Sequence, residues 1–274
     1  MTLLSGAARL AGVMGWPVSH SRSPRIHGTW LARAGIDGAY VPLPVQPQDF
    51  AEVVRGVAKA GFRGVNVTIP HKEAAFAVCD EVADFARRAG AVNTLVFHEG
   101  RILGRNTDGY GFVANVRAHG VKPGAGPALI LGAGGAARAI AAALQDEGAD
   151  VTLTNRTFER AEALARALPG VRVLPWEDRA AALGAFGLLV NTTSLGMRGQ
   201  EALDMGLERA AHGLAVADIV YAPLETALLA EARMRGLKAV EGLGMLLHQA
   251  VPGFAAWFGV TPVVDDELYE IVSA

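Results

Sequence analysis

The sequence is poor in cysteine and has no long hydrophobic run. One cysteine, Cys79, occurs in 274 residues, and a single thiol can form neither an intramolecular disulfide nor a cysteine-based zinc cluster. No basic region followed by a sustained apolar stretch marks a signal peptide near the start. The apolar stretches are interrupted well short of the roughly 20 residues that a membrane span needs. We therefore expect a soluble, cytoplasmic protein with no membrane partner.

An excess of charge of either sign is also missing. The 25 Lys and Arg residues face 27 Asp and Glu residues, and the net charge is -2. This balance gives no electrostatic reason to expect nucleic acid as a partner. Lysine is rare, with only Lys59, Lys72, Lys122 and Lys238, so a lysine inside a motif is informative. The hydrophobic fraction of 51% excludes an intrinsically disordered chain.

Short strands alternate with helices along the whole chain. This rhythm is typical of parallel sheets covered by helices, and a Gly- and Pro-rich linker at 120–127 separates two such regions. Two α/β domains are therefore expected. Ser23 is expected to cap the first helix. We expect strands at 11–14, 40–45 (at a sheet edge), 64–69, 91–97, 101–103, 128–131, 150–154, 171–174, 188–192, 214–220 and 238–240. We expect helices that begin at Ser23, at 48–60, after a glycine-rich turn up to about residue 147, at 158–168, at 225–235 and from Met245 onward, the last with a Pro-Gly break.

A glycine-rich turn follows the expected strand 128–131 and opens a helix. It reads Gly132, Ala133, Gly134, Gly135, Ala136, Ala137, which matches the G-x-G-x-x-A pattern in a β-α-β context. Glycines allow the tight turn and let backbone N–H groups approach a pyrophosphate at the helix N-terminus. The turn predicts a Rossmann-like dinucleotide-binding domain, whereas an ordinary strand-to-helix turn is the alternative.

The end of the next strand indicates which dinucleotide is bound. NAD-binding domains place a carboxylate there for the ribose 2′-hydroxyl, but this chain has Asn155, Arg156 and Thr157, with Arg160 one turn later. Guanidinium groups bind a phosphate through two hydrogen bonds. The sequence therefore predicts NADP, although the neighbouring Glu159 could partly offset the two arginines.

Polar side chains follow several strands of the N-terminal half. Ser21 and Ser23 lie after the first strand, and other hydroxyl, amide and charged groups lie near three later strand ends. Ligands of parallel α/β sheets bind beyond the carboxyl ends of the strands. We therefore expect a polar pocket for a small polyhydroxylated acid, with one lysine and one aspartate as its titratable groups.

These motifs together resemble those of the shikimate dehydrogenase family. The resemblance covers nearly the whole chain in the order and spacing of the family, and it is far more specific than the glycine-rich turn alone. The motifs are Ser21-Arg-Ser-Pro-Arg-Ile-His27, Asn66-Val-Thr-Ile-Pro-His-Lys72, Ala91-Val-Asn-Thr94, Asn106-Thr-Asp-Gly109, Gly132-Ala-Gly-Gly-Ala-Ala-Arg138, Asn155-Arg-Thr157, Asn191-Thr-Thr-Ser194, Asp218-Ile-Val-Tyr-Ala-Pro-Leu-Glu-Thr226 and Gly244-Met-Leu-Leu-His-Gln249.

The resemblance implies reversible, NADPH-dependent reduction of 3-dehydroshikimate to shikimate in aromatic amino-acid biosynthesis. Quinate/shikimate dehydrogenase and aminoshikimate dehydrogenase are alternatives of the same class, and Ser23 in place of threonine favours shikimate. A non-catalytic nucleotide-sensing protein on the same fold is the alternative from another class. Lys72 and Asp108 argue against it, since a sensor needs no proton relay.

The resemblance also implies a role for each motif. The domains would comprise 1–108 with 241–274, with a mixed, mostly parallel sheet, and 109–240, the NADP-binding domain. Lys72 and Asp108 would be catalytic. Substrate would contact Ser21, Ser23, Asn66, Thr68, Lys72, Asn93, Asp108, Tyr221 and Gln249. The cofactor would contact Gly132, Ala133, Gly134, Gly135, Ala136, Ala137, Asn155, Arg156, Thr157, Arg160, Thr192, Ser194, Ile219, Gly242 and Met245.

A few residues depart from the family pattern or invite another interpretation. Trp16, His71 and His248 are unusual neighbours of the motifs, which leaves rate and pH dependence open. His20, His27 and His71 could suggest a metal, but their spacing matches no metal site, so we expect none.

The protein is expected to act as a monomer or a homodimer.

Overall fold

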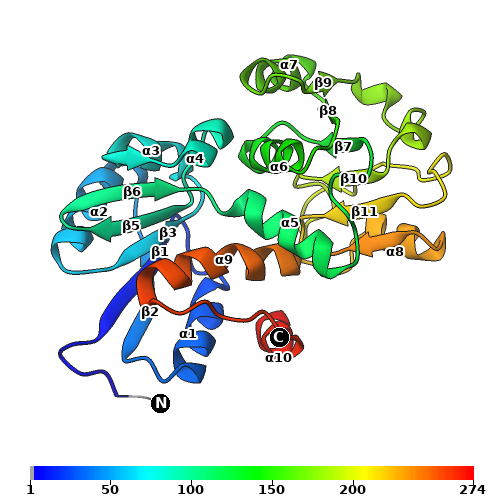
Figure 1. The fold of residues 1–274 in the computed structure, drawn as a ribbon. Helices are drawn as coiled ribbons and strands as arrows, with labels where there is room; N and C mark the ends of the chain where they lie inside the picture. Colours follow the sequence, from blue (N-terminus) through cyan, green and yellow to red (C-terminus); the bar gives the residue numbers. More distant parts are fainter. Residues whose placement is uncertain (1–2) are drawn as a thin grey trace. The chain divides into compact units, whose positions relative to one another are not determined.

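The computed structural model describes residues 3–274, and the chain forms two compact units. The first unit contains the chain up to Thr107 together with Gln249–Ala274, and the second contains Asp108–His248. Each unit is built around one six-stranded sheet (Figure 1). The α/β fold class is therefore confirmed.

The sheet of the first unit is mixed. Its order is β2-β1-β3-β5-β6-β4, with β1 parallel to β2 and β3, and β5 antiparallel to β3 and β6. β2 lies at an edge, as its two prolines predict. The hairpin of β5 and β6 turns at Glu99 and Gly100, both with positive φ. The strands are β1 (Arg9–Gly15), β2 (Gly38–Pro44), β3 (Gly64–Val67), β4 (Glu81–Val82), β5 (Thr94–His98) and β6 (Arg101–Arg105).

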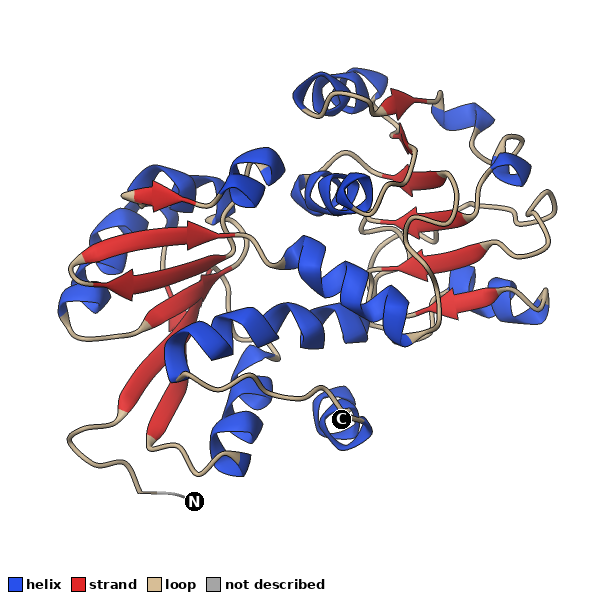
Figure 2. Cartoon of the chain, viewed as in Figure 1, coloured by secondary structure: helices blue, strands red, loops and turns tan. Residues whose placement is uncertain are grey.

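Helices cover the first sheet and bury its apolar side chains. α2 buries Phe50 and Val54, four residues apart on one helical face, against strand residues such as Val65 and Leu95 in one core cluster. The strands and helices of this unit are distinguished by colour in Figure 2. The helices are α1 (Ser23–Arg33), α2 (Phe50–Lys59), α3 (Lys72–Val78), α4 (Asp84–Ala89) and α10 (Asp266–Ser273), with the 3-10 helix η1 (Pro47–Asp49).

The sheet of the second unit is entirely parallel. Its order is β12-β11-β10-β7-β8-β9, which from the other edge is the 3-2-1-4-5-6 order of a Rossmann fold. The carboxyl ends of β7, β8 and β10 therefore meet at one edge. The strands are β7 (Ala128–Leu131), β8 (Val151–Thr154), β9 (Arg172–Val173), β10 (Leu188–Asn191), β11 (Ala215–Asp218) and β12 (Lys238–Val240).

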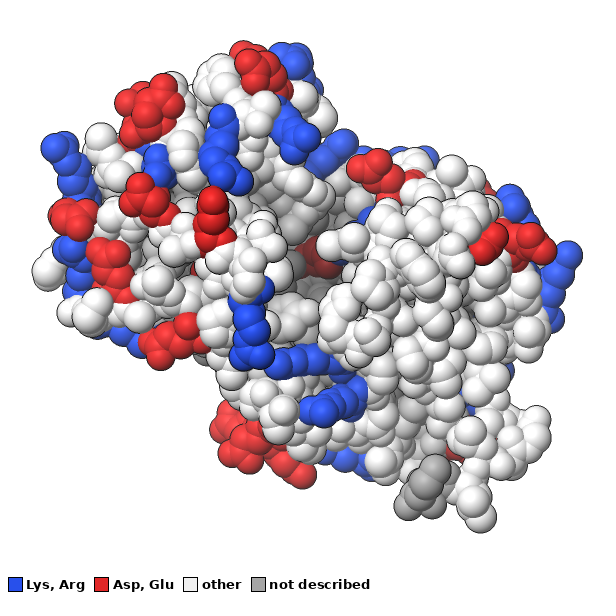
Figure 3. Space-filling view, turned by 180° about the vertical axis from the view of Figure 1, so that it is seen from behind, with Lys and Arg blue, Asp and Glu red and all other residues white. Residues whose placement is uncertain are grey.

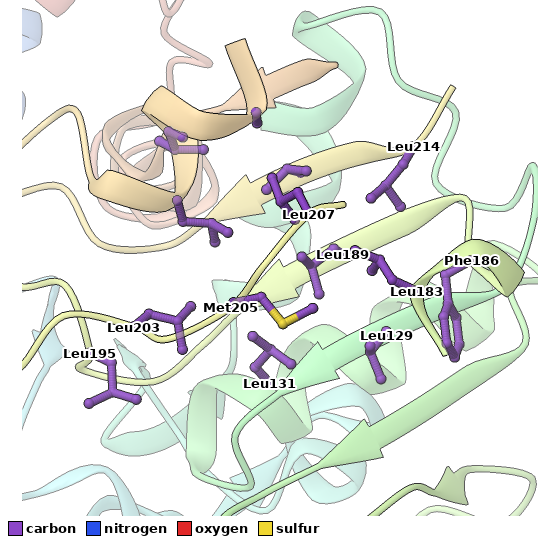
Figure 4. Close-up of a cluster of buried hydrophobic side chains, with 14 residues drawn as sticks. Leu129, Leu131, Leu183, Phe186, Leu189, Leu195, Leu203, Met205, Leu207 and Leu214 are labelled. Atoms are coloured by element: carbon purple, nitrogen blue, oxygen red, sulfur yellow. The ribbon is translucent and has the colours of Figure 1, made fainter. Parts of the chain in front are cut away.

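Leucine-rich packing covers one face of this second sheet. Leu129, Leu131 and Leu189 project from the strands, and the extended segment carrying Leu203 and Met205 packs over them (Figure 4). All five side chains belong to one buried cluster. This packing holds in place the strands whose ends carry the sequence motifs. The helices are α5 (Asp108–Ala118), α6 (Gly135–Asp146), α7 (Phe158–Ala167) and α8 (Ala227–Met234), with the 3-10 helices η2 (Trp176–Asp178) and η3 (Leu183–Ala185), and α9 (Gly242–Phe258) runs from this unit into the first.

Two local expectations are wrong. α9 continues through Pro252 without the predicted break, because the apolar residues on both sides, such as Val251 and Phe254, are buried and hold the helix by packing. Ser23 does not cap α1: it is the first helical residue and its side chain is buried. Over the described chain, no helix is long and apolar enough to cross a membrane.

Candidate active site

Buried amide and hydroxyl side chains of the first unit form one hydrogen-bonded cluster. Asn66 on β3 donates through Nδ2 to Thr94 Oγ1 at 3.1 Å, across the antiparallel register that pairs the two residues. Thr94 Oγ1 donates to Asn93 Oδ1 at 2.9 Å. Asn93 Nδ2 donates to Thr107 Oγ1 at 3.1 Å, and this hydroxyl reaches Gln249 Oε1 at 3.3 Å. The cluster thus brings together Asn66, Asn93 and Gln249, three of the predicted site residues.

The same cluster contains residues that the sequence did not single out for the site. Tyr40 Oη donates to Asn66 Oδ1 at 2.6 Å, and the Tyr40 ring stacks on His27 with centroids 4.0 Å apart. Thr94 and Thr107 are buried links of the chain of bonds. A polar side chain inside a buried strand needs hydrogen-bond partners. The presence of Asn66 in such a strand therefore indicated that other polar residues lie beside it. Their identity depends on strand register, which the sequence does not display.

The burial of His27 and Tyr40 fixes their protonation states. Desolvation lowers the pKa of His27 to about 3, and the neighbouring Asn66 side chain offsets this only in part. Burial raises the pKa of Tyr40 well above its ordinary value, an effect that the Ser23 hydroxyl partly offsets. His27 is therefore neutral and Tyr40 carries its proton near neutral pH. His27 is buried among aromatic rings, including those of Tyr40 and Trp257.

The serine loop lies between β1 and α1. Ser21 Oγ accepts from the backbone N–H of Ser23, the first residue of α1, at 3.3 Å, whereas the N-cap residue Arg22 makes no side-chain cap bond. Ser21 is half-buried, whereas the Ser23 side chain is buried. Ser21 and Ser23, two of the predicted substrate contacts, therefore lie two residues apart where the loop after β1 leads into α1.

Lys72 and Asp108 each begin a helix. Lys72 is the first residue of α3 and is half-buried, and Thr68, which directly follows β3, is also half-buried. Next to Lys72, the buried His71 ring contacts the Val45 carbonyl through Nε2 at 2.8 Å and stacks on Phe50. A carbonyl can only accept, so Nε2 carries the proton, and this anchor fixes the turn that leads into Lys72.

Asp108 is the buried first residue of α5. It directly follows Thr107, whose backbone N–H donates to Asn93 Oδ1 at 2.9 Å. This bond ties the backbone just before Asp108 to the polar cluster of the first unit. The position of the Asp108 carboxylate toward Lys72 stays a prediction.

The glycine-rich turn of the second unit has the open backbone that a pyrophosphate requires. Gly132 has a φ of 111°, and a Cβ there would lie 2.6 Å from Thr192 Oγ1, so glycine is needed for both conformation and space. Gly134 and Gly135 are exposed, with open space where a Cβ would stand. α6 begins at Gly135 and directs its first N–H groups toward this space. Ala133 and Ala136 are half-buried and Ala137 is buried, so the turn fits a dinucleotide.

The predicted phosphate-binding arginines lie after β8. Arg156, Thr157 and Arg160 are exposed, and Asn155 is half-buried. Asn155 Nδ2 donates to the Thr157 carbonyl at 2.8 Å, which shapes the turn. Arg156 lies 3.8 Å from Glu201, and both side chains are largely exposed. The turn presents guanidinium groups with no carboxylate at the strand end, which fits a 2′-phosphate.

A buried carboxylate organises the ends of β10 and β11. Asp218 accepts from Asn191 Nδ2 at 3.0 Å, from the Val220 N–H at 3.0 Å and from Thr226 Oγ1 at 2.8 Å. Burial raises the pKa of Asp218, and these three bonds offset the rise only in part. Asp218 thus ties two strand ends to the start of α8 and fixes the segment that contains Ile219 and Tyr221.

The remaining predicted cofactor residues lie close to the same strand ends. Thr192 Oγ1 donates to the Leu131 carbonyl at 2.6 Å, which joins β10 to the start of the glycine-rich turn. A Cβ on Gly242 would collide with the Ile219 carbonyl, so these two predicted residues touch through backbone. Ser194 is exposed and Met245 is buried.

Side chains of both charge signs lie on the face that Figure 3 displays. Within residues 3–274, no group of three or more His, Cys, Asp or Glu side chains could hold a metal ion. The polar cluster and the turns after β7, β8 and β10 are therefore the candidate functional features.

Family models match both halves of the chain. Residues 13–95 match the shikimate dehydrogenase substrate binding domain, and residues 123–221 match the shikimate / quinate 5-dehydrogenase model. A protein of Acidiphilium cryptum (strain JF-5) named shikimate dehydrogenase (NADP(+)) is 72% identical over 272 residues, which cover 99% of this chain and 98% of the relative.

Solved structures agree with these matches. The shikimate 5-dehydrogenase of Thermus thermophilus, in complex with NADP(H) and shikimate, has a TM-score of 0.88 and 41% identity, covering 97% of this chain and 98% of that one. The quinate dehydrogenase of Corynebacterium glutamicum, in complex with NAD, has a TM-score of 0.89 and 28% identity, covering 97% of each chain. Motifs, fold and full-length similarity thus agree, and the chain belongs to the shikimate dehydrogenase family.

Proposed function

We propose that the protein catalyses the reversible, NADPH-dependent reduction of 3-dehydroshikimate to shikimate. The observation that carries the proposal is the 72% identity, over nearly the full length of both chains, to a protein named shikimate dehydrogenase (NADP(+)). The buried amide and hydroxyl cluster of the first unit supports it, because such groups recognise the hydroxyls of a polyhydroxylated ring. Reduction of this ketone places the enzyme in aromatic amino-acid biosynthesis.

The first unit supplies most of the substrate contacts in this proposal, and Asp108 and Tyr221 of the second unit supply the others. Ser21 and Ser23 donate to the substrate carboxylate from the turn before α1. The ring hydroxyls are bound by the remaining polar residues of the motifs. These are Asn66, Thr68, Asn93, Asp108 and Gln249, and Tyr221 contributes from the segment that Asp218 fixes.

Lys72 supplies the proton. Addition of hydride to the ketone carbon breaks the C=O π bond and places negative charge on the oxygen. The Lys72 ammonium stabilises that charge and transfers a proton from Nζ to the oxygen, which completes the alcohol. In the reverse direction the neutral amine accepts the proton of the hydroxyl. The Asp108 carboxylate orients the reacting hydroxyl by accepting its hydrogen bond.

The second unit holds the cofactor. NADPH, when bound, supplies the hydride. The glycine-rich turn formed by Gly132, Ala133, Gly134, Gly135, Ala136 and Ala137 holds the pyrophosphate through backbone N–H groups other than that of Gly132, which donates to the Thr154 carbonyl at 2.8 Å. Asn155, Arg156, Thr157 and Arg160 hold the 2′-phosphate. Gly132 needs its positive φ and the space beside Thr192, so the cradle depends on glycine. Thr192, Ser194, Ile219, Gly242 and Met245 line the rest of the cofactor.

Quinate oxidation is the second candidate. Its support is the similarity to the quinate dehydrogenase of C. glutamicum. That structure contains NAD, whereas the arginines after β8 favour NADP here. Shikimate with NADP is therefore the preferred combination of substrate and cofactor. Its kinetics are to be compared with those of quinate with NAD.

Location and assembly complete the proposal. We infer that the protein acts in the cytoplasm, where its cofactor and pathway intermediates occur, as a monomer or a homodimer. Fractionation of the source cells and sedimentation of the purified protein test these two statements separately.

A spectrophotometric assay tests the function. NADP reduction is followed with shikimate and then with quinate, and both are repeated with NAD. We expect the highest kcat/KM for shikimate with NADP. A higher kcat/KM for quinate with NAD would favour the second candidate. No absorbance change with any pair, combined with measurable NADP binding, would favour a nucleotide-sensing protein.

A further inference from the structure

Backbone groups fix the orientation of the two asparagines in the polar cluster. Asn66 Nδ2 lies 3.3 Å from the Asn93 carbonyl, which can only accept. The N–H of Thr107 lies 2.9 Å from Asn93 Oδ1 and can only donate. Each amide therefore has one orientation that satisfies the backbone, and rotation by 180° would place two donors or two acceptors together.

This orientation determines the direction in which the Tyr40 and Thr94 hydroxyls donate. The oxygen of Asn66 faces Tyr40, so the phenol must donate to it. Asn93 Oδ1 accepts from the Thr107 N–H and from Thr94 Oγ1. The Thr107 hydroxyl accepts from Asn93 Nδ2 and has two acceptors within reach of its own proton, Asn93 Oδ1 at 3.2 Å and Gln249 Oε1 at 3.3 Å. The bonds thus run in one direction from Tyr40 to Thr107.

Tyr40 stands at the beginning of this directed chain and cannot turn away from it. Its ring is buried and lies parallel to the His27 ring, with centroids 4.0 Å apart and planes 8° apart. The Trp257 ring packs at 6.0 Å from it. Burial raises the pKa of the phenol well above its ordinary value, so Tyr40 remains a donor over the working pH range.

We propose that Tyr40 is a positioning residue for the substrate-binding amides, acting through Asn66 by the hydrogen bond that holds the amide oxygen. The inference rests on the proposed function, because it takes Asn66 to contact shikimate. Without the phenol proton, the Asn66 oxygen loses the Tyr40 donor, and the amide is held less tightly, through its Nδ2 bonds to Thr94 Oγ1 and the Asn93 carbonyl. The substrate then has to order this amide on binding, which weakens affinity.

The first test is Tyr40→Phe, which removes the donor and retains the stacked ring. We expect KM for shikimate to rise about tenfold, the effect of one buried hydrogen bond, while kcat and KM for NADP stay within about twofold. Tyr269→Phe on α10 removes a phenol from the same unit and serves as the matched control. A Tyr40→Phe enzyme with unchanged KM for shikimate would overturn the proposal.

A double-mutant cycle separates positioning from general loss of structure. Tyr40→Phe is measured alone and in an Asn66→Ala background, with shikimate affinity as the readout. If Tyr40 acts through Asn66, it has no further effect once the amide is gone. Equal factors in both backgrounds would show that Tyr40 acts by another route and would contradict the proposal.

A second variant covers the case in which Tyr40→Phe does not fold. Thr94→Val removes the acceptor of Asn66 Nδ2 with little change of shape, so it should raise KM for shikimate in the same selective way. Unchanged KM for shikimate in this variant would count against the directed chain. Wild-type activity judges the proposed function separately: an inactive wild type overturns that function, and the inference with it, whereas an active wild type with additive effects overturns the inference alone.

Discussion

The amide side chains proposed to bind substrate in the first unit are buried and hydrogen-bonded within one cluster, whereas the groups proposed to bind phosphate in the second unit are exposed arginines beside open glycine backbone. Asn66, Asn93 and Gln249 belong to one bonded cluster. Arg156 and Arg160 are exposed, and Gly134 has empty space around it. The first arrangement suits a small ligand whose hydroxyl positions must be distinguished. The second suits a phosphate, which tolerates several geometries of flexible charged groups.

The difference has an energetic basis. Ordering a free side chain on binding costs about 0.5–1.5 kcal/mol, and the buried amides meet this cost during folding. The exposed arginines meet it on binding, but each charge-assisted bond to phosphate contributes about 1.5–3 kcal/mol and offsets it. Mutations in the two units should therefore have separable kinetic effects.

The largest effect is expected for Lys72→Met. Loss of the proton donor should reduce kcat by about 10²- to 10⁴-fold, with NADP affinity unchanged because the cofactor groups lie in the other unit. Steady-state kinetics and NADP titration measure both quantities. The exposed Lys59→Met on α2 is the control. Near-normal kcat would remove Lys72 from catalysis.

In the second unit, we expect substitution of Arg156 to have the largest effect on the KM for NADP. Arg156→Gln removes about 2 kcal/mol of charge-assisted bonding, so KM for NADP should rise about thirtyfold, with little change for NAD and shikimate. Arg166→Gln, an exposed arginine on the helix α7 that follows this turn, provides the comparison. An equal loss with NAD and NADP would contradict a 2′-phosphate contact.

Substitutions of Asp218 test whether buried hydrogen bonds also hold a segment of the second unit in place. Asp218→Ala leaves three donors without an acceptor and should lower the free energy of unfolding by about 3 kcal/mol. Asp218→Asn should cost about 1 kcal/mol, because its oxygen can still accept and Thr226 Oγ1 can reverse to accept from the new amide. Urea unfolding of both variants measures the difference. Equal losses would show that the three bonds do not hold these strand ends.

The smallest effect concerns the pH dependence of the first unit. The folded pKa of His27 is lowered from 6.5 to about 3, so the unfolded chain binds a proton that the folded chain does not. Stability from this source is complete above pH 6.5 and declines as pH falls, by about 2 kcal/mol at pH 5. Between pH 7 and pH 5, the free energy of unfolding of His27→Phe should fall by about 2 kcal/mol less than that of the wild type. Urea unfolding followed by tryptophan fluorescence measures this difference. The exposed His212→Phe in the second unit is the control, and an identical pH dependence for His27→Phe and the wild type would refute the assignment.

Much of the fold could be predicted because its signals are local. The alternation of strands and helices and the glycine-rich turn identified both α/β regions, and β2 was placed at an edge from its prolines. The break at Pro252 was wrong because packing of α9 overrides the local effect of proline. Ser23 was misassigned as a cap because the residue at which a helix begins depends on tertiary contacts of that turn.

The site was predictable only in part, for the same physical reason. Asn66 and Lys72 stand in recognisable motifs, but Tyr40 and Thr94 contact Asn66 from other strands. The contact with Thr94 follows from the antiparallel register of β3 and β5, and that with Tyr40 from the side-chain geometry of β2. Neither relation has a signal in the neighbouring sequence.

A crystal structure of the protein with shikimate and NADP is the most direct test of the contrast between the units. The account predicts that Asn66, Asn93 and Gln249 keep their present rotamers, that Lys72 and Asp108 contact one ring hydroxyl, and that Arg156 becomes ordered on the 2′-phosphate. Amides that change rotamer around shikimate, or a Lys72 ammonium remote from the reacting hydroxyl, would contradict it.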